Sequence, residues 1–462
     1  MQRQVIEHTS VVPAHAGETV IADRKGPDRR PHIVIVGAGF GGLSLVRSLR
    51  RTDARITVID RQNYHLFQPL LYQVATAGLS PADIAAPIRS ILSDQPNARV
   101  LLDEVTGVDK SARHVLLRQG APVSYDYLVI GTGARHSYFG RDEWADLAPG
   151  LKTIDDATRL RRSILLALER AENLPPGPDR DRELTFVMIG GGPTGVEMAG
   201  AVAELTRHAL GNDFRAVMQS KPRILLIESG PRVLGTFPEA LSDCARRSLE
   251  GLGVELRFGA PVTRIDAQGV EVGGERIDSA CVIWCAGVMA SPAAQWLGAE
   301  TADRSGRVKV EPDLSLAGHD NIFLIGDVAA CPQADGRPQP GVAPAAKQMG
   351  EHVARTLAAR IAGRTDQLPP PFAYRNLGNL ATIGRHRAVA DFGRFQLRGT
   401  IAWLFWCIAH IYFLVGFRNR IVVGANWLWH YVTFNRGARL ITGGDPAASP
   451  PRPAPRGEDA VA

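Results

Sequence analysis

The sequence is poor in cysteine, and its few cysteines are scattered. The chain of 462 residues contains five of them, at Cys244, Cys281, Cys285, Cys331 and Cys407. None forms a C-x-x-C pair or a cluster with nearby histidines, which excludes a disulfide framework and a zinc site. We therefore expect no bound metal, and a reducing compartment is the simplest setting.

The sequence also lacks an export signal and a dense basic run. Residues 1–20 have no continuous apolar core of the kind that a signal peptide needs, so we expect the chain to stay in the cytosol. The net charge of +6 comes largely from scattered arginines. This pattern argues against nucleic-acid binding and suits an anionic membrane surface.

Glycine, in contrast, is abundant, with 47 residues, and one cluster follows an apolar run. The run His32–Val36 leads into G-x-G-x-x-G, with glycines at Gly37, Gly39 and Gly42, and then into a helix-forming stretch. In such a loop the first glycine allows a tight turn, the second lets the backbone approach a pyrophosphate, and the third allows close packing of helix on strand. A second apolar run ends in Asp60, 23 residues after Gly37, where a carboxylate can bind ribose hydroxyls. This context predicts a dinucleotide site; the alternative is a plain glycine turn with Asp60 as a solvated strand end.

Two further segments favour a flavin as that dinucleotide. The run YDYLVIGTG ends in Thr132 and Gly133, and the run NIFLIGD ends in Gly326 and Asp327. In the second, a strand delivers Asp327 where it could bind a ribityl chain. Alone, Asp327 could equally be a helix N-cap. All three segments together favour FAD, bound without a covalent link.

A second fingerprint of the same kind follows the apolar run 184–189. Its glycines are Gly190, Gly192 and Gly195, and the next apolar run ends in Glu228, 38 residues after Gly190. We expect the polar stretch 206–221 to absorb this long spacing as an extended helix or loop. A carboxylate at Glu228 favours a free ribose 2'-hydroxyl and repels a 2'-phosphate, which predicts NADH rather than NADPH. The alternative is that Glu228 is only an acid at a strand end.

Glu197 lies just after the last of these glycines, in the first turns of the expected helix. An acid at this place interacts well with the helix dipole, and that alone could explain it. It could also approach the nicotinamide and flavin rings. The residues leave both readings open.

No cysteine lies between Asp60 and Leu102, so electrons from NADH need an acceptor other than a disulfide.

The C-terminal part of the sequence indicates what that acceptor is. Residues 399–417 carry no charged residue except His410, a second apolar run follows Arg420, and four of the seven tryptophans lie here, at Trp403, Trp406, Trp427 and Trp429. The first run only reaches the lower bound for a transmembrane helix, so we expect two helices in the membrane surface, with the tryptophans and flanking arginines as anchors over 399–439. A buried hairpin or a dimer interface is the alternative.

At this point the residues match a known family. The chain resembles the type II NADH dehydrogenases, single-subunit flavoenzymes of the membrane surface that pass electrons from NADH to quinone without pumping protons. The match runs from about residue 32 to residue 442 and includes NYHLFQPLLYQVA (63–75), WCAGV (284–288) and LATIGR (380–385).

The resemblance implies roles for individual residues. Glu197 is similar to the family's glutamate near the nicotinamide and quinone sites, and Ala286 and Gly287 lie in a matching cofactor-binding run. The family's quinone-side pattern A-Q-x-A-x-Q reads Ala343 to Gln348 here, with Gln348 as the second glutamine and Pro344 in place of the first. Leu377 stands where many members have a basic residue.

We therefore predict an α/β fold with two Rossmann-like dinucleotide-binding domains and a C-terminal membrane-associating segment. The expected divisions are a disordered arm (1–31), an FAD-binding domain in two parts (32–150 and 301–370) around an NADH-binding domain (151–300), a membrane-anchoring and quinone-side segment (371–442), and a disordered tail (443–462). The predicted catalytic residues are Glu197 and Gln348, in a peripheral enzyme on the cytoplasmic face of the cell membrane that could be a homodimer. The alternatives are a sulfide:quinone reductase, which needs cysteines beside the flavin, and an NADH-binding redox sensor.

Overall fold

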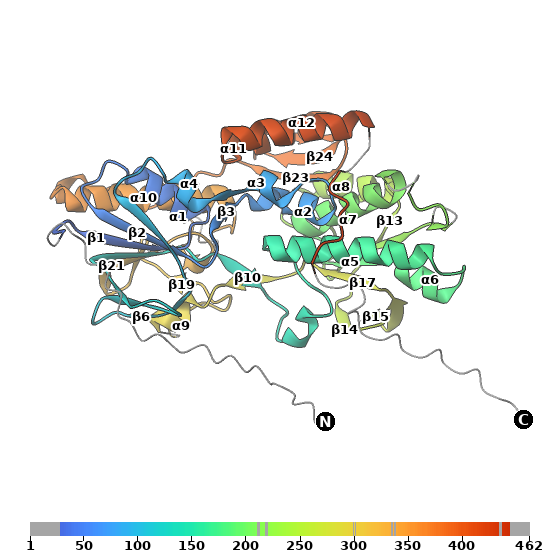
Figure 1. Ribbon diagram of the computed structural model, residues 1–462, viewed down its shortest axis with the longest axis horizontal. Coiled ribbons are helices and arrows are strands. Elements are labelled where there is room, and N and C mark those ends of the chain that lie inside the picture. The colour runs from blue at the N-terminus through green and yellow to red at the C-terminus, as the bar shows by residue number, and fades with distance from the viewer. Residues whose placement is uncertain are drawn as a thin grey trace, which may run out of the picture.

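The computed structural model describes residues 28–443 except 210–212, 218–219, 299, 301, 334–335, 337–338 and 434–436. Most of the predicted N-terminal arm and of the C-terminal tail lies outside these described residues. The chain forms two lobes side by side, with two C-terminal helices lying across the top of the view in Figure 1. The fold is α/β, as the sequence predicts.

The first lobe is built on a six-stranded sheet. In spatial order its strands are β20 (Ser315–Leu316), β21 (His319–Leu324), β9 (Tyr127–Ile130), β1 (His32–Val36), β2 (Arg55–Asp60) and β5 (Ala98–Leu102). All neighbours are parallel except β20 and β21. The central strands are mostly apolar and buried, as expected where both faces of a sheet are covered.

Helices cover one face of this sheet, and small strands cover the other (Figure 1). The helices are α1 (Phe40–Ser48) and α10 (Ala343–Ile361), whose backbones are in direct contact, since a Cβ atom at Gly350 would overlap the carbonyl oxygen of Gly41. The other face carries β6 (Val105–Asp109), β7 (His114–Leu117), β8 (Val123–Ser124) and α9 (Ala293–Leu297).

The second lobe repeats the plan with a smaller sheet. Its four parallel strands are β13 (Val254–Phe258), β12 (Arg223–Glu228), β11 (Thr185–Ile189) and β17 (Cys281–Trp284). Its helices are α5 (Ile154–Glu172), α6 (Pro178–Glu183), α7 (Pro193–Glu204) and α8 (Glu239–Gly251), and its antiparallel strands are β14 (Val262–Asp266), β15 (Gly269–Val272) and β16 (Glu275–Asp278). Beyond α7 the chain makes one π-helical turn, Leu205–Ala209, which takes up part of the long spacing before Glu228.

Two of the crossings between the lobes run through one antiparallel ribbon. The two strands are β10 (Ala134–His136) on the outward passage and β18 (Val288–Ala290) on the return. The first lobe is therefore assembled from two separated parts of the chain.

Shorter elements complete the lobes. They are β3 (Tyr64–Leu66), α2 (Leu71–Ala75), α3 (Pro81–Ile84), β4 (Ala85–Pro87), α4 (Ile88–Ile91), β19 (Val308–Lys309), β22 (Ala329–Ala330), and the 3-10 turns Gln68–Leu70, Asp142–Ala145, Gly326–Val328 and Thr365–Gln367.

The C-terminal part packs on the second lobe. It consists of the antiparallel strands β23 (Asn379–Gly384), β24 (Arg387–Asp391) and β25 (Gln396–Arg398), followed by α11 (Gly399–Phe413) and α12 (Phe417–Thr433). A Cβ atom at Gly200 of α7 would overlap the carbonyl oxygen of Ile383 in β23, so the two backbones touch. This contact fixes the C-terminal part against the second dinucleotide unit.

Helices α11 and α12 have one buried side and one exposed apolar side. Ala402, Trp406 and Val423 are buried, whereas Ile401, Ile408 and Phe417 are 68%, 68% and 78% exposed. None of the helices described is long and apolar enough to cross a bilayer.

The tryptophans of this segment differ from the expectation. Trp406 is buried, Trp403 and Trp427 pack against the core, and only Trp429, at 62%, is mostly exposed. The prediction of four tryptophan anchors is therefore wrong, because the indole rings are large apolar groups that fill the gap between α11 and the lobe. Aliphatic and phenyl side chains form most of the exposed face instead.

Candidate functional site

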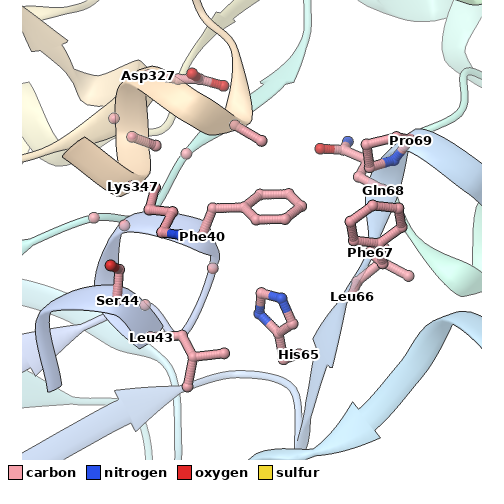
Figure 2. A pocket seen from close by; sticks show the side chains of 18 of the residues that line it. Phe40, Leu43, Ser44, His65, Leu66, Phe67, Gln68, Pro69, Asp327 and Lys347 are labelled. Atoms are coloured by element: carbon pink, nitrogen blue, oxygen red, sulfur yellow. The ribbon is translucent and has the colours of Figure 1, made fainter. Parts of the chain in front are cut away.

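A single long cleft runs through the first lobe and ends at the C-terminal helices. Its volume is about 2180 Å³. Figure 2 shows a part of it, with Phe40 and Lys347 on one side and Phe67 and Gln68 across from them. Of the residues predicted as functional, the cleft is lined by Gly37, Gly39, Asp60, Thr132, Gly133, Glu197, Gly326, Asp327 and Gln348.

The first glycine loop has the geometry that the motif predicts. Gly37 has φ +98°, and a Cβ atom there would lie 2.5 Å from the carbonyl oxygen of Gly131. At Gly42 a Cβ atom would overlap the carbonyl oxygen of Gly37. Gly39 has no heavy atom within 4 Å of where its Cβ atom would lie, so its backbone faces open space. Helix α1 starts at the next residue with no acid in its first turn, which leaves its N-terminus able to attract an anion.

The second loop repeats this geometry closely. Gly190 has φ +110° and lies against Ala286, Gly195 packs on the Gly190 carbonyl, and Gly192 again faces open space. Pro193 occupies the beginning of α7, as predicted. Within this loop region, Pro193 and Thr194 reach the long cleft, so the second unit opens towards the first.

The two strand-end acids occupy equivalent places. Asp60 Oδ2 accepts a hydrogen bond from the Ala38 N–H at 2.6 Å, and Glu228 Oε2 accepts one from the Gly191 N–H at 2.6 Å. Each acid thus binds the second residue of its own loop. The second oxygen of each acid also accepts a backbone hydrogen bond, from the Gln62 N–H to Asp60 Oδ1 and from the Gly230 N–H to Glu228 Oε1.

The other predicted flavin segments meet at the same cleft. The hydroxyls of Thr132 and Ser291 lie 2.5 Å apart, and Gly133 accepts a hydrogen bond from the Ser291 N–H. Asp327 lies inside a 3-10 turn whose N-cap is Ile325, so it is not the helix N-cap that the alternative required. Its side chain lines the cleft.

Ala286 and Gly287 do not line the long cleft, in contrast to their neighbour Val288. They lie against the second loop instead, where a Cβ atom at Gly190 would be 2.6 Å from the Ala286 nitrogen. Gly287 has φ +70° and accepts a hydrogen bond from the Ser137 N–H at the crossover ribbon. Both residues therefore belong to the second unit.

Glu197 lies where the two units meet. It lines both the long cleft and a second cavity of about 120 Å³ that also touches Tyr72, Thr382 and Trp406. Burial raises the pKa of Glu197 to about 8, and a hydrogen bond from the Thr382 backbone opposes the rise. Glu197 is therefore protonated at neutral pH and can donate a hydrogen bond or a proton.

Gln348 lies on the cleft, but its amide is already engaged. Its Nε2 donates to the Arg375 carbonyl and its Oε1 accepts from the Arg375 N–H, both at 2.9 Å. The side chain thus ties the segment before β23 to α10. This explains how Gln348 shapes the cleft, and it leaves one N–H and one lone pair of the amide for a substrate.

Several cleft residues escaped the sequence analysis. The ring of Phe40 meets the edges of His65 at 5.2 Å and Phe67 at 5.9 Å, and all three line the cleft (Figure 2). His65 Nδ1 donates to the Ala38 carbonyl at 2.9 Å, which holds the first loop. Lys152 and Lys347 also line the cleft. The run NYHLFQPLLYQVA was the available signal for His65 and Phe67, but it carries no indication of what each side chain touches.

Comparison with known proteins decides the family. Residues 31–350 match the family described as pyridine nucleotide-disulphide oxidoreductase, and residues 376–436 match the NDH2 C-terminal domain. The type II NADH:quinone oxidoreductase Ndh of Mycobacterium tuberculosis is 43% identical over 90% of this chain and 91% of its own length. The chain belongs to the type II NADH:quinone oxidoreductase family. This confirms the resemblance found in the sequence.

More distantly similar proteins are found in eukaryotes. The external NADH-ubiquinone oxidoreductase 2 of Saccharomyces cerevisiae mitochondria is 28% identical over 86% of this chain and 80% of its own. The solved structure of NDH2 from Plasmodium falciparum in complex with NADH superposes with a TM-score of 0.81 at 21% identity, covering 90% of this chain and all of that one. This likeness supports the fold.

A sulfide:quinone oxidoreductase from Aquifex aeolicus shares the fold more loosely. Its TM-score is 0.68 at 21% identity, over 84% of this chain and 92% of that one. In the present chain, the described lining of the long cleft contains no cysteine. Burial raises the pKa of the Cys285 thiol to about 12, so this neighbour of Glu197 is not a ready nucleophile. The type II family is therefore the better guide to the chemistry.

Proposed function

We propose that this chain transfers two electrons from NADH to a membrane quinone through a non-covalently bound FAD, without pumping protons. The observation that carries the proposal is the continuity of one cleft. It begins at the first glycine loop, passes the start of the second unit at Pro193, and reaches the turn between α11 and α12 at Val415. A donor and an acceptor can therefore approach one cofactor from two different parts of the molecule.

The residues of the first unit fit FAD. The open space at Gly39 admits a pyrophosphate against the N-terminus of α1, Asp60 faces the ribose position, and Asp327 faces the middle of the cleft. Bound FAD supplies the two-electron chemistry that no side chain here provides. The protein holds the cofactor and shields it, and the aromatic rings of Phe40 and Phe67 form part of its wall.

The second unit fits NADH. The open space at Gly192 admits the pyrophosphate, and Glu228 faces the ribose, where its charge would repel a 2'-phosphate. Pro193, Thr194 and Glu197 lead from this loop into the cleft, which is where a nicotinamide ring would lie. Glu197, protonated at neutral pH, is placed to hand a proton to the acceptor side.

The exposed apolar face of α11 and α12 fits a membrane surface. We place the enzyme on the cytoplasmic face of the cell membrane as a peripheral protein, so that quinone reaches the cleft from the lipid. In this assignment the first lobe (32–150 and 301–370) holds FAD, residues 151–300 hold NADH, and residues 371–442 anchor the enzyme and form the acceptor side.

The test is an anaerobic assay of the purified, FAD-loaded enzyme. NADH should be oxidised only when a ubiquinone or menaquinone analogue is added, and NADPH should react much more slowly. Sulfide in place of NADH should give no quinone reduction. NADH oxidation that does not depend on quinone would overturn the proposal.

A further inference from the structure

We propose that Lys347 binds a carbonyl oxygen of the quinone at the acceptor end of the cleft. This inference rests on the proposed function, since it assigns a residue to the acceptor half of that reaction. Lys347 was not a predicted site residue, and no comparison assigns it a role.

The position of Lys347 is set by close backbone packing. It lies near the beginning of α10, one residue after Ala346, whose carbonyl oxygen lies 3.0 Å from the Cβ position of Gly41. A Cβ atom at Gly326 would also lie 3.2 Å from the Ala346 side chain. The start of α10 thus packs between the first loop and the segment of Asp327, so the backbone at Lys347 is held in place on both sides.

The ammonium group of Lys347 lies between α10 and α11, in one long ion pair and over one aromatic ring. Its Nζ is 3.9 Å from Glu351 Oε1, which is too long for a hydrogen bond, and 5.9 Å from the centre of the Phe413 ring. Glu351 itself accepts a hydrogen bond from Ser44 at 3.2 Å. Figure 2 shows Lys347 and Ser44 on one side of the space, across from Phe67 and Gln68. Half of the Lys347 side-chain surface is exposed, so its three N–H donors can reach a ligand.

The surroundings suit a flat apolar ring. Leu377, Phe413 and Phe417 line the same cleft, and the Phe413 ring lies beside the Lys347 ammonium. A quinone is such a ring, with two carbonyl oxygens that only accept hydrogen bonds. It therefore needs a donor at this apolar end.

Other polar groups at this end are partly engaged with the protein. The Gln348 amide is paired with the Arg375 backbone. His410 Nδ1 donates to the Trp406 carbonyl at 2.7 Å, and burial lowers the pKa of His410 to about 4, so the ring is neutral and its other nitrogen accepts only. Arg420 donates through Nε to the Leu414 carbonyl and lies over the Tyr412 ring. Lys347 is a cationic donor whose ammonium lies over the Phe413 ring instead.

The experiment compares Lys347→Met, Lys347→Arg and the matched control Lys309→Met in the full FAD-loaded enzyme. Lys309 is an exposed lysine of β19 that does not line the cleft. Two quantities are measured: the dissociation constant of an oxidised short-chain ubiquinone by calorimetry, and the rates of the two half-reactions by anaerobic stopped flow.

Loss of a charged hydrogen bond should weaken ubiquinone binding and raise its KM about ten-fold or more in Lys347→Met. Lys347→Arg should recover most of this loss, Lys309→Met should show none, and NADH should bleach the flavin of every variant within about two-fold of the wild-type rate. Unchanged ubiquinone binding in Lys347→Met would overturn the inference. Equal losses of rate in both half-reactions would also overturn it, because they would indicate a structural role. Weaker binding to phosphatidylglycerol vesicles with unchanged quinone binding would overturn it too, because it would indicate a lipid contact. A wild-type enzyme that reduces no quinone would instead refute the proposed function.

Discussion

Glu197 is the residue whose environment most alters its chemistry. A glutamate on the surface is ionised at neutral pH, but burial raises the pKa of Glu197 to about 8. The side chain lies between the long cleft and the smaller cavity, so it can exchange protons with one and deliver them to the other. Its protonation state should therefore appear in the pH dependence of quinone reduction.

Substitution of Glu197 by glutamine tests this. In the wild type the protonated acid is present below pH 8 and is lost as the pH rises through its pKa of about 8, so kcat/KM for quinone should fall above that pH. Glu197→Gln keeps the shape but cannot titrate. It should react about a hundred-fold more slowly and lack this alkaline fall. The measurement is a pH profile with a water-soluble quinone, and a fall of the same size in both proteins would refute the assignment.

Glu228 should decide between the two nicotinamide cofactors. Its carboxylate accepts hydrogen bonds from the N–H groups of Gly191 and Gly230, which holds the negative charge beside the second glycine loop. We expect kcat/KM for NADH to exceed that for NADPH by about a hundred-fold, and Glu228→Gln to reduce this ratio about ten-fold because the charge is removed. Asp60→Asn serves as the control, since it lies at the equivalent place in the other unit and should not change the ratio. Equal rates with NADH and NADPH in the wild type would refute the role of Glu228.

At the scale of elements, two glycines of each loop are required by the backbone, and the third leaves room for a ligand. Gly37 and Gly190 need positive φ, and Gly42 and Gly195 need the space that a side chain would occupy. Gly39 and Gly192 have φ −68° and −70° and open space, so alanine fits both without strain. Alanine substitutions at Gly39 and Gly192 should therefore affect ligand binding without disturbing the fold.

The variants Gly39→Ala and Gly192→Ala should each weaken the binding of a different cofactor. Without FAD, both should unfold at a Tm close to that of the FAD-free wild type, because neither substitution introduces a clash. Gly39→Ala should lose most of its bound FAD, whereas Gly192→Ala should keep FAD and raise the KM for NADH about ten-fold or more, since the added methyl group keeps the pyrophosphate from the backbone. Absorbance of bound flavin and steady-state kinetics give the two readings. If the two variants behaved alike, the division of cofactors between the lobes would be wrong.

At the scale of the whole molecule, the C-terminal part has an inner side that packs on the protein and an outer side that is exposed and apolar. Its inner side packs on α7 and lines the acceptor end of the cleft through His410, Phe413 and Val415. Its outer side carries exposed Ile401, Leu404 and Ile408. In the function that we propose, membrane attachment and quinone access therefore lie at one end of the molecule.

Charges on the outer side should detach the enzyme from lipid. The double variant Leu404→Glu/Ile408→Glu should bind vesicles of phosphatidylcholine and phosphatidylglycerol about a hundred-fold more weakly, because two apolar side chains leave the lipid and two negative charges are repelled. Leu102→Glu, at an exposed leucine of the first lobe, should bind as the wild type does. Unchanged vesicle binding together with a shift from dimer to monomer in sedimentation would show that this face is a dimer interface.

The sequence by itself determined the dinucleotide units. Strand, glycine loop and helix are contiguous in the chain, so their geometry is local, and the predicted apolar strands, the turn at Gly37 and the helix that carries Glu197 are all present. The acids Asp60 and Glu228 follow from the same rule, because the next parallel strand ends beside the loop. Patterns confined to some forty residues carry this information without any knowledge of the rest of the fold.

Only the tertiary structure decided how the acceptor end is built. Gln348 is bound to Arg375, three of the four tryptophans pack inward, and Lys347 lines the long cleft. The pKa of Glu197 depends on burial among α2, α7 and β23, which are far apart in the chain. Residue type and local spacing do not specify which side chains from distant segments meet, and hydrogen-bond satisfaction and desolvation arise only from those meetings.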